Sequence, residues 1–239
     1  MSYSIESITE SIGARRMGNA PATIDWLLTD SRSLNFPEET LFFALTTKRN
    51  DGARYIADLY ARGVRNFVLS EESFRLMDNG QLTIDNAMQR DDAQSIVNYL
   101  IVPNPLKALQ KLAEQHRNRF QIPVIGITGS NGKTVVKEWL HQLLSPERAI
   151  IRSPRSYNSQ IGVPLSVWQM NEQSELAIFE AGISEPGEMR ALQNIIKPTI
   201  GILTNIGGAH QENFFSLQEK CMEKLTLFND CEAIIYDGD

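Results

Sequence analysis

The stretch Gly126-Ile-Thr-Gly-Ser-Asn-Gly-Lys-Thr134 decides the fold of this chain. It overlaps the end of an apolar run at residues 124–128. It is followed by apolar residues at helical spacing, namely Val136, Trp139, Leu140 and Leu143. A glycine-rich turn that joins a buried strand to an amphipathic helix and ends in Lys-Thr is typical of a phosphate-binding loop. Its glycines let successive backbone N–H groups point at phosphate oxygens, and the helix N-terminus adds the positive end of its dipole. The sequence therefore predicts an α/β domain that binds ATP.

The end of the loop carries two residues with expected roles. Lys133 would neutralise charge on the β- and γ-phosphates, and the Thr134 hydroxyl would bind Mg²⁺. The general pattern has glycine at the position of Ile127, whereas here Gly126 stands one place early. A glycine-rich turn with a chance Lys-Thr pair is the alternative, although strand, loop and helix all agree with a phosphate loop. The residues expected to contact ATP in this stretch are Thr128, Gly129, Ser130, Asn131, Gly132, Lys133 and Thr134.

Short, almost continuous apolar runs follow the loop, at residues 149–151, 176–179, 199–203 and 233–236. Runs of this kind are typical of strands buried on both faces of a mostly parallel sheet. We therefore predict a doubly wound α/β domain over residues 103–239, entered through a helix at 106–119. The chain ends at Asp239, directly after the last predicted strand. We expect this domain to be incomplete at its C-terminus and the chain to be part of a longer protein.

Residues 1–102 are predicted to form a second, small α/β domain with a linker. Isoleucines recur at helical spacing up to Gly13, which should end a first helix. Apolar runs predict strands at 26–28, 41–45 and 66–69, with a helix at 55–62 between the last two. A polar segment at 85–92 and the sequence Pro103-Asn-Pro105 place the boundary between the domains near residue 103.

The composition excludes several classes of protein. The 239 residues carry a net charge of -6 with a pI near 5.2, which provides no basic surface for nucleic acid. The first residues lack the basic and apolar regions of a secretion signal, and no apolar run approaches the roughly 18 residues of a membrane span, so we expect a cytoplasmic protein.

Cys221 and Cys231 are too few for a disulfide framework or a metal-ligand cluster. His116 and His141 lie on predicted helices and are assigned structural roles. The oligomeric state stays open.

Polar groups follow two of the predicted strands, and ligands of parallel α/β sheets bind beyond the carboxyl ends of the strands. The strand at 176–179 is followed by Glu180, where a carboxylate binds Mg²⁺ in phosphate-loop proteins. The strand at 199–203 is followed by Thr204-Asn-Ile-Gly-Gly-Ala-His210, whose two glycines allow a close approach. On chemistry alone, a surface acid at Glu180 and a structural histidine at His210 are the alternatives.

Together these motifs resemble those of the Mur ligases, which join amino acids or peptides to UDP-N-acetylmuramate in bacterial cell-wall synthesis. The loop is similar to that family's own variant of the phosphate loop, which accounts for Ile127. Val135-Val136 departs from the Thr-Thr usual in the family and should affect helix packing rather than phosphate contacts. The resemblance covers nearly the whole chain and rests on Thr29-Asp-Ser-Arg32, Leu41-Phe-Phe-Ala-Leu45, Asp51-Gly52, Val135-Val-Lys-Glu138, Tyr157-Asn-Ser-Gln-Ile-Gly-Val-Pro164, Glu180-Ala-Gly-Ile-Ser-Glu-Pro-Gly-Glu-Met189 and Thr204-Asn-Ile-Gly-Gly-Ala-His-Gln-Glu-Asn-Phe214.

The resemblance implies a role for individual residues. The first domain would hold the UDP-sugar end of the substrate, with Asp30, Ser31 and Arg32 near the uridine nucleotide. In the second domain, Asn158 and Asn205 would contact nucleotide or metal.

Magnesium would be held by Thr134, Glu180 and His210. A lysine is expected to add a fourth ligand after carbamylation, because its new carboxylate binds Mg²⁺ in this family. Lys224 stands 14 residues after His210, at the expected spacing, and Lys220 is a nearby competitor.

Within the family, the residues match best the branch that adds D-alanyl-D-alanine to a UDP-N-acetylmuramoyl tripeptide. Such a reaction forms an acyl phosphate from ATP, which the incoming amine then attacks. Lys133, Glu180, His210 and Lys224 would be its catalytic residues, since negative charge accumulates on oxygen in both steps.

The sequence leaves other assignments open. Another Mur-type or folylpolyglutamate-type ligase is an alternative. So is a nucleotide-dependent switch or a non-catalytic binding module, although the Asn-Lys-x-Asp motif of GTPases is absent. The family carries a further C-terminal domain, so residues 1–239 alone are expected to bind the UDP ligand but to turn over weakly. The third residue of the peptide and a fusion to an alanine racemase after Asp239 cannot be read from these residues.

Overall fold

The computed structural model describes residues 1–47, 50–78, 96–207 and 213–238. The chain divides into two compact units, residues 1–112 and 113–239, and the division falls within helix α5 (Pro105–Arg117). The sequence placed the boundary near residue 103, just before that helix. No helix in the described ranges is both long and apolar enough to cross a bilayer.

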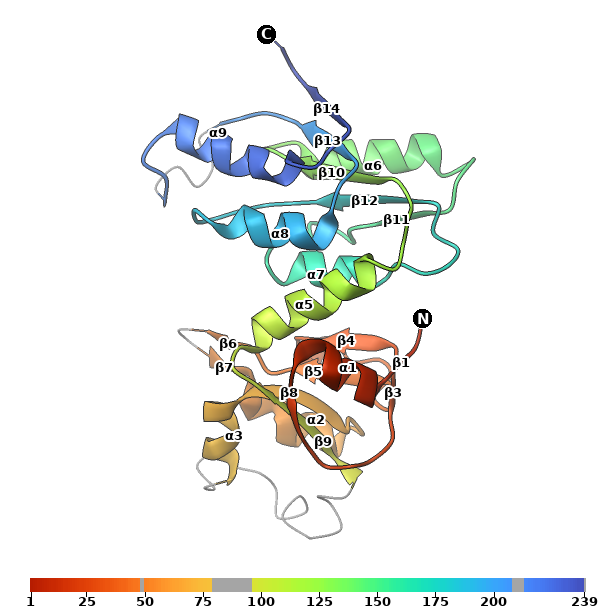
Figure 1. The fold of residues 1–239 in the computed structure, drawn as a ribbon, viewed down its shortest axis with the longest axis vertical. Coiled ribbons are helices and arrows are strands. Elements are labelled where there is room, and N and C mark those ends of the chain that lie inside the picture. The colour runs from red at the N-terminus through yellow and green to blue at the C-terminus, as the bar shows by residue number, and fades with distance from the viewer. Residues whose placement is uncertain (48–49, 79–95, 208–212, 239) are drawn as a thin grey trace. The chain divides into compact units, whose positions relative to one another are not determined.

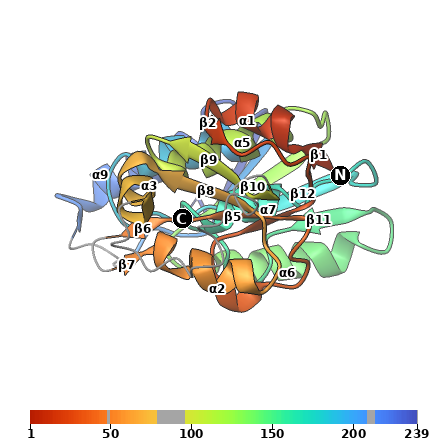
Figure 2. The same ribbon diagram turned by 90° about the horizontal axis from the view of Figure 1, so that it is seen from below.

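The first unit contains a five-stranded sheet in the order β2-β9-β8-β5-β4. Only β2 runs antiparallel to its neighbour. Helices α1 and α2 lie on opposite sides of this sheet (Figure 2). The main elements are α1 (Ile5–Ile12), β2 (Arg15–Met17), β4 (Trp26–Leu28), β5 (Thr40–Phe43), α2 (Ile56–Ala61), β8 (Asn66–Ser70), α3 (Glu71–Asp78) and β9 (Asn98–Val102). Shorter elements are β1 (Tyr3–Ser4), β3 (Thr23–Ile24), β6 (Thr46–Thr47), β7 (Asn50–Asp51) and the 3₁₀ turns η1 (Ser31–Ser33) and η2 (Gly52–Tyr55).

Most of the local predictions in this unit are confirmed. Helix α1 ends at Gly13, which adopts the left-handed conformation (φ 69°) that glycine tolerates best. The predicted strands correspond to β4, β5 and β8. Strand β9 was missed, because its short apolar run lies between the polar segment at 85–92 and Pro103, a stretch that the sequence assigned to the linker. The polar segment itself lies outside the described residues.

The second unit contains a five-stranded sheet in the order β11-β12-β10-β13-β14, and every pair in it is parallel (Figure 1). The strands are β10 (Val124–Thr128), β11 (Ile150–Arg152), β12 (Leu176–Glu180), β13 (Ile200–Leu203) and β14 (Ala233–Tyr236). The helices are α6 (Lys133–Leu144), α7 (Gly162–Val167), α8 (Glu188–Ile196) and α9 (Leu217–Leu225), followed by the 3₁₀ turn η4 (Thr226–Phe228). The predicted strands and the mostly parallel α/β class are confirmed.

Helices cover both faces of this sheet, as in a doubly wound domain. Residues of α7, α8 and η4 form one apolar core with Val124 of β10 and with Ala177 and Phe179 of β12. Helix α6 packs on the opposite face, against a smaller core that includes Ile125 and Ile127, and Figure 2 shows it on one side of β10, β11 and β12.

The predicted apolar face of α6 was partly wrong. Val136, Leu140 and Leu144 pack against the sheet, whereas Trp139 and Leu143 are 64% and 73% exposed. The packed residues are four apart, so they form one row along the helix. Trp139 and Leu143 precede two of them by one position, which rotates their side chains away from the sheet.

The early glycine of the loop, Gly126, has a packing role. It lies inside β10, and a Cβ atom there would stand 2.8 Å from Cβ of Pro198. Because that space is already filled, only glycine fits without a shift of β10 or of the turn before β13. Gly126 therefore belongs to the strand rather than to the phosphate-binding turn.

Candidate nucleotide-binding site

The loop after β10 adopts two backbone conformations that favour glycine. Gly129 has φ 146° and Gly132, which caps the N-terminus of α6, has φ 82°. A Cβ atom on Gly129 would also lie 2.0 Å from Oγ1 of Thr204, which is far inside contact distance. The glycines let the chain reverse direction so that Lys133 and Thr134 begin α6 directly above the strand end.

The loop is braced by the residues that follow β13. The Asn205 carbonyl accepts a hydrogen bond from Ser130 N, and its side-chain Oδ1 accepts one from Asn131 N, both at 2.9 Å. The Thr204 hydroxyl donates to Asn131 O at 2.5 Å, and Gly207 N donates to the Ser130 hydroxyl at 2.8 Å. Asn205 therefore holds the loop through its backbone and its side chain at once.

Thr128 lies at the base of the loop rather than on its open side. Its side chain is completely buried, and its hydroxyl donates to Ala181 O at 2.9 Å. Its carbonyl accepts from Thr204 N at 3.0 Å. Thr128 thus ties β10 to the ends of both neighbouring strands.

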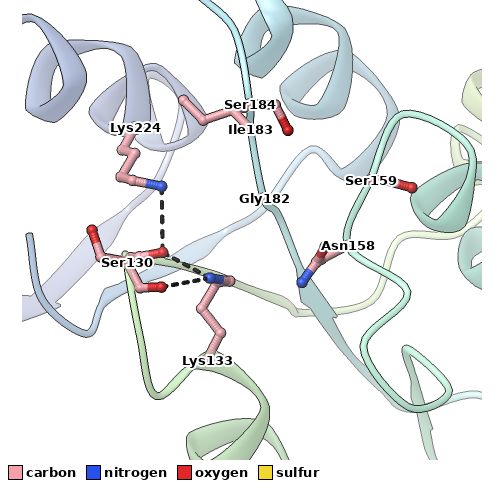
Figure 3. A pocket seen from close by; sticks show the side chains of 9 residues that line it. Ser130, Lys133, Asn158, Ser159, Gly182, Ile183, Ser184 and Lys224 are labelled. Atoms are coloured by element: carbon pink, nitrogen blue, oxygen red, sulfur yellow. Dashed lines mark hydrogen bonds between the residues drawn. The ribbon is translucent and has the colours of Figure 1, made fainter. Parts of the chain in front are cut away.

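Lys133 folds back over the loop that precedes it (Figure 3). Its ammonium donates to the carbonyls of Gly129 and Ser130, at 2.8 and 3.4 Å. Burial lowers the pKa of Lys133 below its ordinary value, Glu180 opposes this shift, and Lys220 adds to it. The ammonium lies where an incoming phosphate would provide a stronger acceptor than a neutral carbonyl.

Glu180, at the end of β12, contacts Thr134, which follows the end of the neighbouring strand β10. The Thr134 hydroxyl donates to Glu180 Oε2 at 3.0 Å, and Asn158 Nδ2 lies 3.5 Å from the same oxygen. Glu180 is completely buried, so it is no surface acid. A carboxylate oxygen and a hydroxyl oxygen side by side fit Mg²⁺, which takes few protein oxygens and fills its shell with water and phosphate.

Helix α9 brings two buried lysines to the same region. Lys224 Nζ donates to Gly129 O at 3.3 Å, whereas Lys220 Nζ donates to Gly207 O at 2.5 Å. Burial, with Lys133 and Lys220 nearby, lowers the pKa of Lys224 to about 8. Of these two lysines, only Lys224 lines the cavity beside the loop.

That cavity has a volume of about 130 Å³. Pockets that enclose whole drug-sized ligands typically measure about 300–1,000 Å³, so this one matches only the phosphate end of a nucleotide. Figure 3 shows side chains from the loop, from α9 and from the segments after β11 and β12 gathered around it. Its lining is Gly129, Ser130, Lys133, Asn158, Ser159, Gly182, Ile183, Ser184 and Lys224.

Other predicted residues lie elsewhere. His210 lies outside the described residues. Asp30, Ser31 and Arg32 belong to the first unit, where Asp30 caps η1 and pairs with the exposed Arg32 at 2.6 Å. Among the described residues, no group of three or more His, Cys, Asp and Glu side chains could hold a metal ion.

The structure also adds residues that sequence reasoning gave no role. Lys137 was expected on α6 without a function, yet its ammonium lies 2.8 Å from Glu180 Oε1. Ser156 Oγ lies 3.4 Å from Thr134 Oγ1. A lysine within a helix gives no signal of burial in the sequence, so Lys137 could not have been found there.

Comparisons with known proteins give relatives of this chain. Residues 127–238 match the Mur ligase middle domain. The chain is 34% identical over 208 residues to the UDP-N-acetylmuramoyl-tripeptide--D-alanyl-D-alanine ligase of Borreliella burgdorferi, covering 86% of this chain and 43% of that protein. The ligase of the same name from Bacillus subtilis is 30% identical over 219 residues, and the match covers 90% of this chain and 44% of that protein.

Solved structures give the same assignment of the fold. MurF from Acinetobacter baumannii superposes on the whole chain with a TM-score of 0.83 at 23% identity, covering 49% of that protein. The MurF ligase from Thermotoga maritima in complex with ADP gives a TM-score of 0.70 at 25% identity, covering 89% of this chain and 45% of that one. The chain thus spans less than half the length of these relatives, and it belongs to the Mur ligase family, with a Mur ligase middle domain at residues 127–238.

Proposed function

We propose that this chain is the ATP-binding part of a ligase that adds D-alanyl-D-alanine to a UDP-N-acetylmuramoyl tripeptide. The observation that carries the proposal is the junction of the phosphate loop with Glu180, where Thr134 Oγ1 lies 3.0 Å from the carboxylate. The names of the Borreliella and Bacillus relatives supply the substrate class. A cytoplasmic location follows from this proposal, because ATP and the nucleotide-linked substrate would be used there.

The reaction has two balanced steps. A carboxylate oxygen of the tripeptide attacks the γ-phosphorus of ATP, and ADP leaves as the bond to the bridging oxygen breaks. The amine nitrogen of D-alanyl-D-alanine then attacks the carbonyl carbon of the acyl phosphate. Phosphate leaves, the nitrogen loses a proton, and an amide bond has formed.

Charge stabilisation is the part of this reaction that the chain's own residues would perform. Lys133 leaves its carbonyl partners and binds the β- and γ-phosphate oxygens, while loop N–H groups hold the same phosphates. Thr134 and Glu180 would hold Mg²⁺, with His210 and a carbamylated Lys224 as further ligands. Bound Mg²⁺ would neutralise phosphate charge and help align the γ-phosphate.

The remaining residues would bind substrate. Asn158 lines the cavity next to Glu180 and would contact nucleotide or metal, whereas Asn205 would act mainly by bracing the loop. In the first unit, Asp30, Ser31 and Arg32 would lie near the uridine nucleotide. The side chain of Arg32 is 88% exposed, so it is accessible to such a ligand.

Phosphate release by the natural full-length protein tests this function. It is measured with ATP, the UDP-N-acetylmuramoyl tripeptide and D-alanyl-D-alanine, and each compound is omitted in turn. Release that requires all three supports the proposal. Release without the dipeptide or without the tripeptide contradicts it and favours another ligase or an ATPase. In a separate test, residues 1–239 alone should bind the UDP ligand with little turnover.

A further inference from the structure

Lys137 is a charged residue in the interior of the second unit, one helical turn after Lys133. Its side chain is 0% exposed. The ammonium lies 2.8 Å from Glu180 Oε1 and 3.2 Å from Glu138 Oε1. It also donates to Ser153 O at 2.8 Å and to Arg155 O. A buried ammonium is expensive unless it is paired and hydrogen-bonded, and these contacts satisfy both conditions.

The two carboxylate oxygens of Glu180 have different partners. Oε1 faces Lys137 as an ion pair, although its alignment is not that of a regular hydrogen bond. Oε2 faces the opposite way, toward Thr134 at 3.0 Å and toward Asn158 at 3.5 Å. A metal ion beside Thr134 would therefore meet one carboxylate oxygen, because the other is held by the ammonium.

Lys137 also holds the turn at residues 155–156, on the side of Glu180 that carries Oε2. Arg155 adopts a positive φ of 49°, which is unfavourable for a residue with a side chain, and its carbonyl accepts from Lys137. The same turn carries Ser156, whose hydroxyl lies 3.4 Å from Thr134 Oγ1, and leads to Asn158. One ammonium thus links α6, the segment after β11 and the end of β12.

We propose that Lys137 is a positioning residue that keeps Glu180 a one-oxygen ligand and thereby favours Mg²⁺ over Ca²⁺ in the nucleotide site. The inference rests on the proposed function, because it takes Glu180 as a metal ligand. Mg²⁺ demands compact octahedral geometry and usually binds one carboxylate oxygen at a time. Ca²⁺ accepts more ligands and readily takes both oxygens of a carboxylate. Because Lys137 holds Oε1, Glu180 cannot offer both of its oxygens to one ion, and the two-oxygen coordination that Ca²⁺ accepts is prevented.

The test compares ATP binding with each ion, in the absence of the other substrates. Calorimetric titrations of the natural full-length protein give the Kd for ATP in Mg²⁺ and in Ca²⁺, and the ratio of the two is the readout. The ratio is used because loss of the Lys137 ammonium changes the affinity for ATP with Mg²⁺ and with Ca²⁺ alike. Lys137→Met should lower the preference for Mg²⁺ about tenfold, within the range typical of residues that orient metal ligands.

Lys197→Met is the matched control. Lys197 is another lysine of the second unit, but it precedes β13 and so lies at the amino-terminal end of the sheet, paired with Glu114 at 3.5 Å. This variant should keep the wild-type ratio. A folded Lys137→Met protein that also keeps the wild-type ratio overturns the inference while leaving the proposed function intact. Wild-type ATP binding that needs no divalent ion overturns the proposed function, and the inference with it.

A measurement on the wild-type protein covers the case in which Lys137→Met does not fold. Infrared difference spectra of the ATP complexes report how a carboxylate binds its metal, and the Glu180 band is assigned by its loss in Glu180→Gln. One-oxygen coordination is expected with Mg²⁺ and with Ca²⁺ alike. A two-oxygen signature with Ca²⁺ in the wild type shows that Lys137 does not hold Oε1, and overturns the inference.

Discussion

Thr134 Oγ1 donates a hydrogen bond to Glu180 Oε2 at 3.0 Å, although the two residues are 46 positions apart in the chain. Thr134 is the second residue of α6, the helix after β10, and Glu180 ends β12, the strand next to β10. The pair joins a phosphate-binding turn to a buried carboxylate, which is the minimum needed to hold a metal–nucleotide complex.

Lys133→Ala should abolish ATP turnover by the natural full-length protein. The ammonium is the cation that the loop itself offers to the phosphates, and removal of one such charge-stabilising group typically costs about 10²–10³-fold in rate. Phosphate release is the measurement, with Lys197→Ala as the control that should keep wild-type activity. Near-normal release from Lys133→Ala would contradict the assignment of the loop.

Gly129→Ala should impair nucleotide binding far more than Gly132→Ala. At Gly129 the new Cβ would lie 2.0 Å from Thr204 Oγ1, so the loop or its bracing must move. At Gly132 the nearest atom to a Cβ is 3.8 Å away, which leaves only the cost of a positive φ, about 1–2 kcal/mol. Titration with a fluorescent ATP analogue and thermal unfolding measure the two effects. Equal losses in both variants would show that the contact with Thr204 has no importance for the loop.

Carbamylation of Lys224 should increase with CO₂ and with pH. Only the neutral amine attacks CO₂, forming the carbamate and releasing a proton. Because burial and two neighbouring lysines lower the pKa of Lys224 to about 8, its neutral fraction rises steeply as the pH increases toward and through that value. Incorporation of ¹³C-bicarbonate, followed by NMR, measures the adduct. The signal should be lost in Lys224→Arg and kept in Lys220→Arg; the reverse result would make Lys220 the modified residue.

His116 should make the second unit less stable in mild acid. Its Nε2 lies 3.0 Å from Met170 O, its ring packs against Phe120 and against Trp168, and burial lowers its pKa from 6.5 to about 4. The unfolded chain therefore binds a proton first as the pH falls, so stability is lost between about pH 6.5 and pH 4 and is fully present above that window. The difference between the two pKa values corresponds to about 3 kcal/mol.

Denaturant unfolding at a series of pH values measures this loss. His116→Gln should flatten the slope between pH 6.5 and pH 4. His141→Gln changes a more exposed histidine on α6 and should alter the slope much less. An unchanged slope in His116→Gln would show that other groups cause the acid sensitivity.

Much of the local structure could be predicted because short-range rules govern it. Gly13 ends α1 since glycine tolerates the left-handed conformation, and continuous apolar runs became the parallel strands of the second sheet. The turn after β10 was predicted from its glycines and its Lys-Thr pair. The same rules failed on α6, where a count of apolar residues could not tell that Trp139 faces away from the sheet.

The sequence by itself determined the phosphate loop, the alternation of strands and helices, and the end of α1 at Gly13. Those properties depend on neighbouring residues and on local torsion angles. The tertiary structure decided which strand ends adjoin, because the order β12-β10-β13 follows from long crossover connections. That order brings Glu180 to Thr134, Asn205 to the loop and Lys224 to Gly129, 95 residues away. It also buries Lys137 against Glu180, because a charge in the low-dielectric interior is tolerated only beside a partner of opposite charge.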